Sequence, residues 1–592
     1  MKLTGGEIVV RALEEEGIPF AFGIPGTHNI ELYDALAASR SVRPVLVTDE
    51  QSASFMADAV WRASGRMACT NVVPGAGLTH ALSGIAEAFM DTVPMLVLGC
   101  GIRGDTGMAF QLHDVDQASV VAPLCKAVFR PRTGQELYAA LRDACRTART
   151  GAPGPVFVEV PADLYLLRQE AELPPREEGR EGIPGSGPVV ARAGIPPAGA
   201  EADAAVLDRA ASLLRGSRRP LLYVGAGAAD ARRDVLRLAE LLDAPVATTF
   251  QGKGVFPEDH PLFLWPGFGR AAPPFARRIA AERDLTLAVG CRFGEVATAG
   301  YGVDPPRPLL HVDIDPSVPG RNFPAELAVA ADAGGFLRGV LERLAGEGAR
   351  GPDEELREWI RDGHAEVWEE WLEPSGGGRV TPAVLLRALQ EELGPATIFT
   401  TDSGNGTFLA MECLRLREPG KFLAPVDYSC MGYAVPAAIG AKLARPDCPV
   451  VALAGDGAFL MTGLELLTAA AEGVGVMVFV LRDRELAQIA QFQETALNRK
   501  VASRLPDYDL AAIAAGVGAA FLPLEGNREV AGTIRAAAAE AAGGRPVVVD
   551  VAIDYSRRTW FTRGVVRSVL GRLPLGERMR FVGRALVRRL TG

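Results

Sequence analysis

Two aspartates in the last third of the chain have the residue type and spacing of metal ligands. Asp456 lies in Gly455-Asp456-Gly457, directly after an apolar run, and Asp483 follows a second apolar run 27 residues later. A right-handed strand–helix–strand crossover brings both carboxylates to the carboxyl ends of parallel strands, where α/β proteins bind ligands. The helix expected to start at Gly457-Ala458 offers free N–H groups to an anion. The pattern therefore predicts Mg²⁺ held jointly with a diphosphate, and the alternative is an ordinary crossover with an acidic turn.

Most of the chain alternates short apolar runs with longer amphipathic stretches. This alternation is typical of parallel sheets covered by helices, and it predicts an α/β fold. An ordinary helix is expected from Thr4, with Glu7 in the capping-box position. The expected strands cover residues 20–22, 43–47, 67–73, 95–98 and 156–160, then 220–224, 245–248, 285–289 and 309–312, and finally 397–400, 450–453, 476–481 and 546–551.

Two segments without periodicity divide the 592 residues, which are too many for one hydrophobic core. Residues 172–200 are rich in Pro, Gly and charge, as expected of a linker. Residues 346–380 are charged and end near Ser375-Gly376-Gly377-Gly378, after what we expect to be a short Trp-containing helix. The predicted units are domains at 1–170, 200–345 and 378–555, and a tail at 556–592.

The formal net charge of −10 argues against nucleic-acid binding, but it is unevenly distributed. Residues 557–592 contain ten Arg and one acidic residue, Glu577, so this tail carries +9 and the rest of the chain −19. In the tail, Val, Leu, Met and Phe lie between the arginines, interrupted by Gly571, Pro574 and Gly576. Such a segment suits a short helix on an anionic membrane, or docking on the acidic body of the protein itself.

The sequence favours a cytoplasmic protein. No apolar run approaches the 18 or so residues that span a bilayer, and no charged-then-apolar signal segment follows Met1. The eight cysteines are scattered without a CxxC pair or zinc-ligand spacing. We therefore expect buried thiols in a reducing compartment.

The stretch from Val450 to Leu486 resembles the cofactor-binding motif of thiamine-diphosphate (ThDP) enzymes. In that family the metal ligands are the Asp of Gly-Asp-Gly, the last residue of a later Asn-Asn pair, and the next backbone carbonyl. The resemblance implies that Asp456, Asp483 and the carbonyl of Arg484 hold Mg²⁺. Arg482-Asp483 stands in place of Asn-Asn, but an aspartate remains a competent oxygen ligand, and the flanking arginines could offset its charge.

Five further segments, in the family's order, resemble the acetolactate synthase and benzaldehyde lyase branch of these enzymes. The resemblance implies three consecutive doubly wound parallel-sheet domains, which bind the pyrimidine, form the centre, and bind the diphosphate. It also implies a homodimer or homotetramer, because the pyrimidine and diphosphate domains meet across subunits. The matching segments cover residues 22–26, 75–98, 252–262, 309–316 and 428–433.

The implied activity is a ThDP- and Mg²⁺-dependent carboligase or decarboxylase acting on a 2-oxo acid or aldehyde. Alternatives within the enzyme class are a 2-hydroxyacyl-CoA lyase and a membrane-associated 2-oxo acid decarboxylase, and outside it a non-catalytic scaffold of the same fold. Residues 486–489 differ from the run common in acetolactate synthases, so a substrate larger than pyruvate is a further alternative. FAD is not expected, because Gly294-Glu295 resembles the lyase that lacks flavin.

The resemblance also assigns residues to the cofactor. Glu50 is implied as the carboxylate that exchanges a proton with the aminopyrimidine ring, with its pKa raised by an apolar site; without the resemblance it is a surface glutamate after a strand. Met431 is implied to lie beneath the cofactor and the Ser429 carbonyl to face its amino group, although Met431 could be an ordinary core residue. The other half of the diphosphate cradle is implied to be Gly404-Asn405-Gly406, which is otherwise a plain Gly-rich turn.

Three polar residues are candidates on the substrate side. His28 matches an active-site histidine of benzaldehyde lyase, and Gln111 matches an active-site glutamine of both enzymes of the branch. His113 follows two residues later and has no family counterpart; each histidine could instead be merely solvated. Two positions depart from the family pattern, with Asp49 in place of a histidine and His80 in place of an asparagine. Asp49 puts a second acidic group beside Glu50, which would raise the pKa of one of the two.

Overall fold

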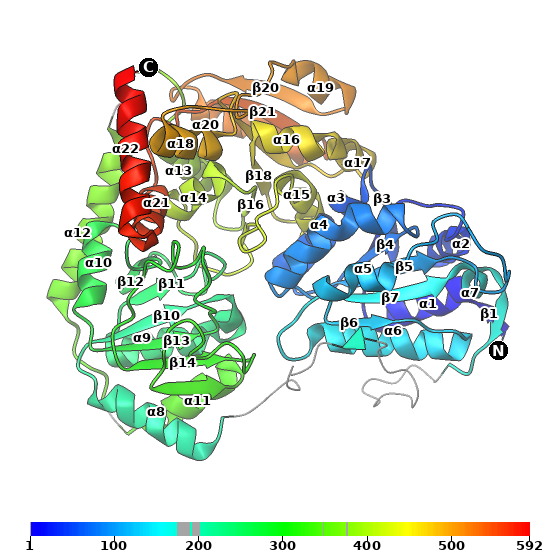
Figure 1. Ribbon diagram of the computed structural model, residues 1–592, viewed down its shortest axis with the longest axis horizontal. Helices are drawn as coiled ribbons and strands as arrows, with labels where there is room; N and C mark the ends of the chain where they lie inside the picture. Colours follow the sequence, from blue (N-terminus) through cyan, green and yellow to red (C-terminus); the bar gives the residue numbers. More distant parts are fainter. Residues whose placement is uncertain (1, 174–189, 192–201, 347, 374–376, 592) are drawn as a thin grey trace.

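The computed structural model describes residues 2–173, 190–191, 202–346, 348–373 and 377–591. Three parallel-sheet α/β domains follow one another along the chain (Figure 1), as predicted. Each of the thirteen expected strands is present within a few residues of its expected position. Within the expected linker, Val190–Ala191 pairs with the first sheet, and most of the remainder, like Ser375 and Gly376, lies outside the described residues.

The first sheet has the order β3-β2-β4-β5-β7-β6-β9 and is parallel except for β9. Its first helix starts as expected, because the Thr4 hydroxyl and the Glu7 side chain form a reciprocal capping box. The strands are β2 (Phe20–Gly23), β3 (Arg43–Leu46), β4 (Cys69–Val72), β5 (Leu96–Gly101), β6 (Ala127–Phe129), β7 (Val156–Pro161) and β9 (Val190–Ala191), with β1 (Lys2–Thr4) and β8 (Arg168–Glu170) paired separately. The helices are α1 (Gly5–Glu15), α2 (Ile30–Ala38), α3 (Glu50–Ser64), α4 (Ala76–Met90), α5 (Gln117–Val121), α6 (Gly134–Arg149) and α7 (Ala162–Leu166).

The second sheet is parallel throughout, in the order β12-β11-β10-β13-β14-β15. Its central strands are buried on both faces, which explains their continuous apolar sequences. The strands are β10 (Pro220–Val224), β11 (Val246–Thr248), β12 (Phe263–Pro266), β13 (Leu285–Val289), β14 (Leu309–Asp313) and β15 (Leu327–Ala330). The helices are α8 (Ala204–Gly216), α9 (Arg232–Leu242), α10 (Pro274–Ala281) and α11 (Ala333–Leu344).

The third sheet is also parallel, in the order β17-β16-β18-β19-β21-β20. The strands are β16 (Ile398–Thr401), β17 (Phe422–Leu423), β18 (Val450–Gly455), β19 (Met477–Arg482), β20 (Ala520–Leu524) and β21 (Val547–Ala552). The helices are α13 (Pro382–Leu393), α14 (Asn405–Cys413), α15 (Ala434–Ala444), α16 (Asp456–Thr462), α17 (Leu466–Ala471), α18 (Ala487–Leu497), α19 (Leu510–Gly516) and α20 (Val530–Ala542).

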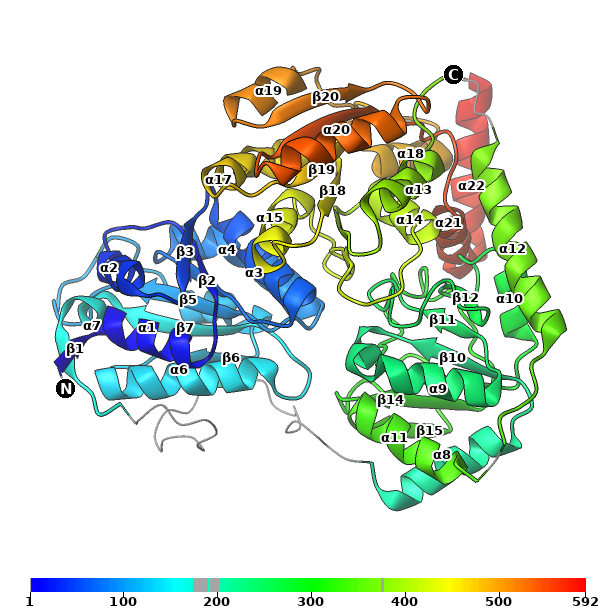
Figure 2. The same cartoon turned by 180° about the vertical axis from the view of Figure 1, so that it is seen from behind.

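Helix α12 (Glu354–Leu372) corrects one expectation. It has 19 residues, and so is not the short helix expected before the glycine-rich turn. Leu356, Ile360, Val367 and Trp371 bury one face of it at helical spacing, against a core shared by the second and third domains. Figure 2 shows α12 along the outer edge of both domains, where it contacts α10 and α13.

The first and third domains pack through helices α3, α4 and α15. The close approach of these helices depends on glycine: a Cβ on Gly440 would lie 2.4 Å from the Met56 carbonyl oxygen, and one on Gly84 would lie 2.1 Å from the Ser54 hydroxyl. Residues of both domains form one continuous apolar core around this contact. The contact positions α3 between the two domains, and Glu50 is the first residue of this helix.

The tail forms two helices, α21 (Trp560–Arg572) and α22 (Leu575–Thr591), rather than the one short helix expected; Pro574 lies between them, whereas Gly571 and Gly576 lie within the helices. All eight cysteines are buried and free, which confirms the expectation of buried thiols. Among the described residues, no helix is both long enough and apolar enough to cross a membrane.

Candidate active site

Asp456 and Asp483 lie side by side at the edge of the third sheet. Strands β18 and β19 are parallel neighbours with Gly455 opposite Leu481, so the residue after each strand reaches the same edge. Asp456 is 1% exposed, and its carboxylate accepts the N–H groups of Gly457 at 2.8 Å and Arg484 at 2.7 Å. Burial and the neighbouring Asp456 raise the pKa of Asp483 to about 7. Two close carboxylates with no ion-pair partner among the described residues form a donor set that suits a divalent cation.

The flanking arginines are expected from the sequence to offset the charge of Asp483, but both guanidinium groups pair with other carboxylates. Arg482 points to Asp550, 2.7 Å away, and to Asp507, 3.0 Å away. The guanidinium of Arg484 lies 3.4 Å from the same Asp507. Arg484 has a φ of +62°, and its carbonyl, the expected third metal ligand, accepts the N–H of Leu505 at 2.9 Å. A carbonyl has two lone pairs, so this bond leaves one acceptor site on it.

A pocket of about 110 Å³ adjoins the two aspartates and is lined entirely by residues of the third domain and the segment just after it. Gly404 has a φ of +134°, a conformation that favours glycine, and Asn405 starts α14 next to it. A Cβ on Gly457 would lie 2.6 Å from a methyl of Leu486 and 3.7 Å from the Met431 methyl, so the glycine leaves room at the pocket wall. The residues predicted for the diphosphate side that line this pocket are Gly404, Asn405, Gly406, Met431, Gly455, Asp456, Gly457, Ala458 and Asp483.

Ser429 lies in a strained turn beside this pocket. Its φ is +67°, and its hydroxyl is 2.7 Å from the hydroxyl of Ser403. Ser403 itself lines the pocket, so the structure places the 403–406 and 429–431 segments together. These two segments and the Asp456 turn form a single site from three separate parts of the chain.

Glu50 occupies the first turn of α3 and is 8% exposed. Asp49 caps this helix, because its carboxylate accepts the Gln51 N–H at 2.8 Å. Burial is the largest effect on Glu50 and raises the pKa of its carboxyl, with a smaller rise from Asp49. A Cβ on Gly77 would lie 3.0 Å from one Glu50 oxygen, so the glycine keeps this carboxyl accessible from the start of α4. The environment is the one expected of a carboxyl that exchanges a proton.

The two departures from the family pattern near Glu50 lie opposite each other. His80 Nδ1 is 3.4 Å from a carboxylate oxygen of Asp49 and 3.6 Å from one of Glu50. Polar atoms of these three side chains all lie within 4.8 Å of one another. An acidic side chain at position 49 therefore faces an imidazole at position 80.

The three candidates on the substrate side differ in their surroundings. The rings of His28 and His113 are 5.6 Å apart, edge to face, and burial and the neighbouring His113 lower the pKa of His28. His113 also lies against Gly75, which precedes α4. Gln111 donates to the carbonyls of Arg103 at 3.0 Å and Met108 at 3.3 Å, so its amide nitrogen is engaged by its own exposed loop. The structure thus brings the two histidines together and leaves Gln111 turned toward its loop.

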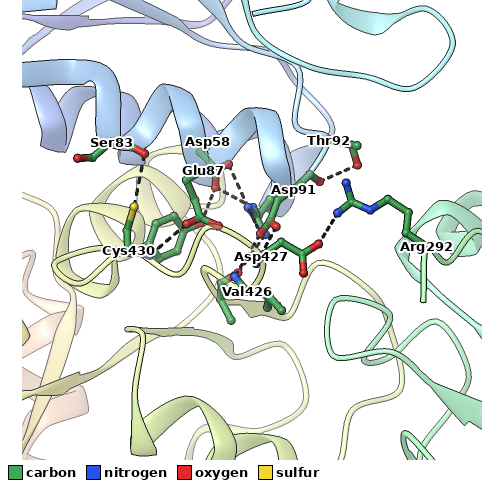
Figure 3. A network of polar contacts seen from close by, with 12 residues as sticks. Asp58, Ser83, Glu87, Asp91, Thr92, Arg292, Val426, Asp427 and Cys430 are labelled. Atoms are coloured by element: carbon green, nitrogen blue, oxygen red, sulfur yellow. Dashed lines mark hydrogen bonds and ion pairs between the residues drawn. The ribbon is translucent and has the colours of Figure 1, made fainter. Parts of the chain in front are cut away.

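Sequence reasoning missed a buried polar network that joins all three domains (Figure 3). Arg62 pairs with Asp58 at 2.7 Å and with Asp91 at 2.9 Å, and it donates to the Ala424 carbonyl of the third domain. Asp91 in turn accepts the N–H of Asp427 at 3.2 Å, and Asp427 pairs with Arg292 of the second domain. No motif marks these residues, because partners as far apart in sequence as Asp91 and Asp427 meet only in the folded chain.

The same network reaches the segment beneath the candidate cofactor pocket. Burial, and to a smaller extent the neighbouring Asp91, raise the pKa of the fully buried Glu87 carboxyl. It accepts the Cys430 N–H at 3.2 Å, and the Cys430 thiol donates to the Ser83 carbonyl at 3.4 Å. Helix α4 of the first domain therefore holds the backbone between Ser429 and Met431.

Replacing Arg62 with alanine is expected to lower the free energy of unfolding by about 3–5 kcal/mol, because Asp58 and Asp91 are left buried and uncompensated. The measurement is the free energy of the first cooperative transition in denaturant-induced unfolding. Arg66→Ala, an exposed arginine two residues past the end of α3, should change it by less than about 0.5 kcal/mol. Equal effects of the two variants would contradict a stabilising role for the network.

Three family models match this chain in order. They describe the N-terminal TPP-binding, central and C-terminal TPP-binding domains of thiamine pyrophosphate enzymes, and they match residues 3–120, 207–340 and 402–551. An acetolactate synthase large subunit of Corynebacterium glutamicum is 30% identical over 578 residues, covering 94% of this chain and 88% of its own. A probable acetolactate synthase large subunit of Methanocaldococcus jannaschii is 31% identical, covering 83% and 82%. The large subunit of an Escherichia coli acetolactate synthase isozyme is 28% identical, covering 94% and 96%.

Proposed function

This chain belongs to the ThDP-dependent enzymes of the acetolactate synthase branch, and we propose that it forms a carbon–carbon bond between a 2-oxo acid and a second carbonyl compound. The observation that carries this proposal is the pair Asp456 and Asp483, at neighbouring strand ends beside a glycine-walled pocket. Bound ThDP supplies a carbon nucleophile that adds to the substrate carbonyl. The protein binds the cofactor and positions side chains and backbone groups around it.

The residues of the third domain fit a magnesium diphosphate. Asp456, Asp483 and the Arg484 carbonyl would hold Mg²⁺, and the backbone of 404–406 and 457–458 would face the diphosphate. Met431, which lines the pocket, would lie beneath the cofactor and set its shape, and the Ser429 carbonyl would face the amino group of the pyrimidine. Glu50 would exchange a proton with the aminopyrimidine ring, and its burial supports this role.

The experiment that tests the function is incubation with ThDP, Mg²⁺ and a panel of 2-oxo acids, alone and with aldehydes, followed by mass detection of products. We expect release of carbon dioxide and a condensed hydroxy-ketone product from at least one pair. Calorimetric titration with ThDP should show binding that requires Mg²⁺. Binding without any product would restrict the proposal to the substrates tested, whereas no magnesium-dependent binding would favour the scaffold alternative.

A second copy of the chain is proposed to complete the site, giving at least a homodimer. The pocket beside Asp456 takes none of its lining from the first domain, where Glu50 and His28 lie. Next to that pocket, α16, α17 and the 3-10 turn between them (Gly463–Glu465) carry four large apolar side chains that are each 43–63% exposed: Leu460, Met461, Leu464 and Leu467. A row of large apolar side chains beside an incomplete site suits an interface between copies. A monomer mass by light scattering for the ThDP- and Mg²⁺-loaded protein would overturn this proposal.

We propose that the enzyme works without a flavin. The support for this proposal is the pair Gly294-Glu295, which resembles the corresponding residues of the lyase that lacks flavin. A cavity of about 570 Å³ does lie at the carboxyl ends of the second sheet, lined by Gly227, Gly290, Arg292 and Asp313 among others. A visible flavin absorbance band in the purified protein would overturn the proposal.

The start of the tail docks on the acidic body of the protein. The Phe561 and Phe408 rings stack with centroids 4.1 Å apart. The backbone N–H of Trp560 donates to the Glu412 carboxylate at 2.6 Å. Arg563 pairs with Glu370 at 2.8 Å on α12. Helix α21 is therefore part of the folded body, as the second of the two interpretations of the tail predicts.

Helix α22 packs against α18 but leaves an apolar stripe exposed. Leu575, Met579 and Val582 lie on one face at helical spacing and are each 47–70% exposed, and arginines of this helix lie between them in the sequence. We propose a cytoplasmic enzyme that binds anionic membranes peripherally through this stripe. The eight free thiols support the reducing compartment.

The expected result is that the full-length protein co-sediments with vesicles containing anionic lipid, less so as salt is raised, and not with neutral vesicles. A chain ending at Leu573 removes α22 and spares the docked α21, and it should lose this binding. Val582→Glu tests the same stripe by one substitution. Equal sedimentation of all three proteins would exclude a membrane role for α22.

A further inference from the structure

A pocket of about 370 Å³ lies between the second domain and helix α21, away from the residues assigned to the reaction. Its wall includes Arg270, Arg277, Tyr301 and Asp304 of the second domain, and Ser568 and Arg572 of α21. The two parts of the chain meet closely here, because a Cβ on Gly302 would lie 2.3 Å from the Ser568 hydroxyl. The pocket is thus built by the docking of the tail on the second domain.

Three arginines face this pocket without a carboxylate partner. In the part of the chain that the structure describes, no Asp or Glu lies within salt-bridge distance of Arg270, Arg277 or Arg572, although other arginines of the same helices are paired. Arg278 of α10 lies 3.3 Å from Glu282, and Arg563 of α21 lies 2.8 Å from Glu370. Asp304 is the one acidic residue in the pocket wall, so the lining has a net charge of +2.

Two of the three arginines contact the other part of the chain that forms the pocket. The guanidinium of Arg572 lies 4.7 Å from the centre of the Tyr301 ring and donates to the Tyr301 carbonyl at 3.4 Å. Arg270 extends over the end of α21, where a Cβ on Gly571 would lie 2.7 Å from its Nη1. Holding like charges together costs free energy unless an anion offsets them.

A buried hydroxyl adds a second, independent sign of a missing partner. Ser568 is 2% exposed, and its Oγ has no hydrogen-bond partner among the described residues. Buried hydroxyls are usually hydrogen-bonded, and this one, which packs against Gly302, would meet a ligand atom in the pocket by rotating about its Cα–Cβ bond. Arginines are the side chains that bind phosphate most specifically, through paired N–H donors, and three of them line this one pocket.

We propose that this pocket binds the phosphate group of a small molecule, between Arg270, Arg277 and Arg572, with the Ser568 hydroxyl as a further donor. The ligand would join α21 to the second domain, because Arg572 and Ser568 come from the tail and the other two arginines do not. The proposal is independent of the carboligase function, since no pocket residue is among those assigned to ThDP, Mg²⁺ or substrate. Free phosphate and a phosphate ester share the recognised chemistry.

The test is calorimetric titration of the enzyme saturated with ThDP and Mg²⁺, at constant ionic strength in chloride. One arm uses inorganic phosphate and the other adenosine monophosphate. We expect saturable binding in at least one arm, weakened about tenfold or more in Arg277→Ala and in Arg572→Ala. Arg567→Ala is the matched control, since this arginine is exposed on α21 just before Ser568 and lies outside the pocket.

Tighter binding of the nucleotide would identify a phosphate ester as the ligand, and equal binding would identify free phosphate. Thermal unfolding of each variant establishes that it is folded. Because Arg572 is exposed at the end of α21, its replacement is expected to disturb the core least. Two results would overturn the proposal. One is the absence of saturable binding in both arms up to about 10 mM, the range of the weakest specific affinities. The other is an equal change in Arg277→Ala, Arg572→Ala and Arg567→Ala.

Discussion

Glu50→Gln is expected to reduce carboligase turnover by about 10²–10⁴-fold while leaving the protein folded. A glutamine has nearly the same shape, so the start of α3 and its Asp49 cap remain. It cannot exchange the proton that a carboxyl in this buried position can exchange with the aminopyrimidine ring. The measurement is initial rate at saturating ThDP and Mg²⁺, with the cofactor affinity determined separately by calorimetry.

The effect should fall on turnover far more than on cofactor binding. Glu31→Gln, on α2 and outside the candidate site, serves as the matched control and should retain wild-type turnover. A Glu50→Gln enzyme that keeps more than about a third of wild-type turnover would refute the role assigned to Glu50. Loss of both turnover and the folded state would be resolved by Glu50→Asp, which keeps the carboxyl but withdraws it by one methylene.

The central strands of all three sheets could be predicted from sequence, because parallel strands buried on both faces are apolar throughout. The strands missed were short or at sheet edges, such as Ala127–Phe129 and Phe422–Leu423, where two or three residues carry too little pattern. The length of α12 was also misjudged. Many of its residues are charged, so the apolar residues that recur at helical spacing, from Leu356 to Trp371, were not recognised as the buried face of one long helix.

Residue spacing alone predicts the candidate site only where its residues are close together in the sequence. The spacing of Asp456 and Asp483 reflects one crossover, so it could be recognised along the chain. The pairing of Asp49 with His80, and the support of Cys430 by Glu87, depend on helices brought together by the fold. Pairings of this kind leave no spacing rule in a single sequence. Asp49 and His80 stood out only as departures from the family pattern, and Glu87 did not stand out at all.

Asp456→Ala is expected to weaken magnesium-dependent ThDP binding by at least about 100-fold, the upper end of the effect of residues that merely orient metal ligands. The substitution removes an expected ligand and also leaves the N–H groups of Gly457 and Arg484 without their acceptor. Calorimetric titration of ThDP at fixed Mg²⁺ measures the loss. Turnover should fall in parallel and recover in part at high Mg²⁺.

Asp483→Asn is the informative counterpart. It gives the amide that the family pattern has at this position, keeps one oxygen for the metal, and removes a carboxyl whose pKa burial and the neighbouring Asp456 raise to about 7. We therefore expect binding at neutral pH to be at least as tight as in the wild type, even though a charge has been removed. A loss as large as that of Asp456→Ala would show that the second negative charge is required. Wild-type binding by Asp456→Ala would instead place the metal elsewhere.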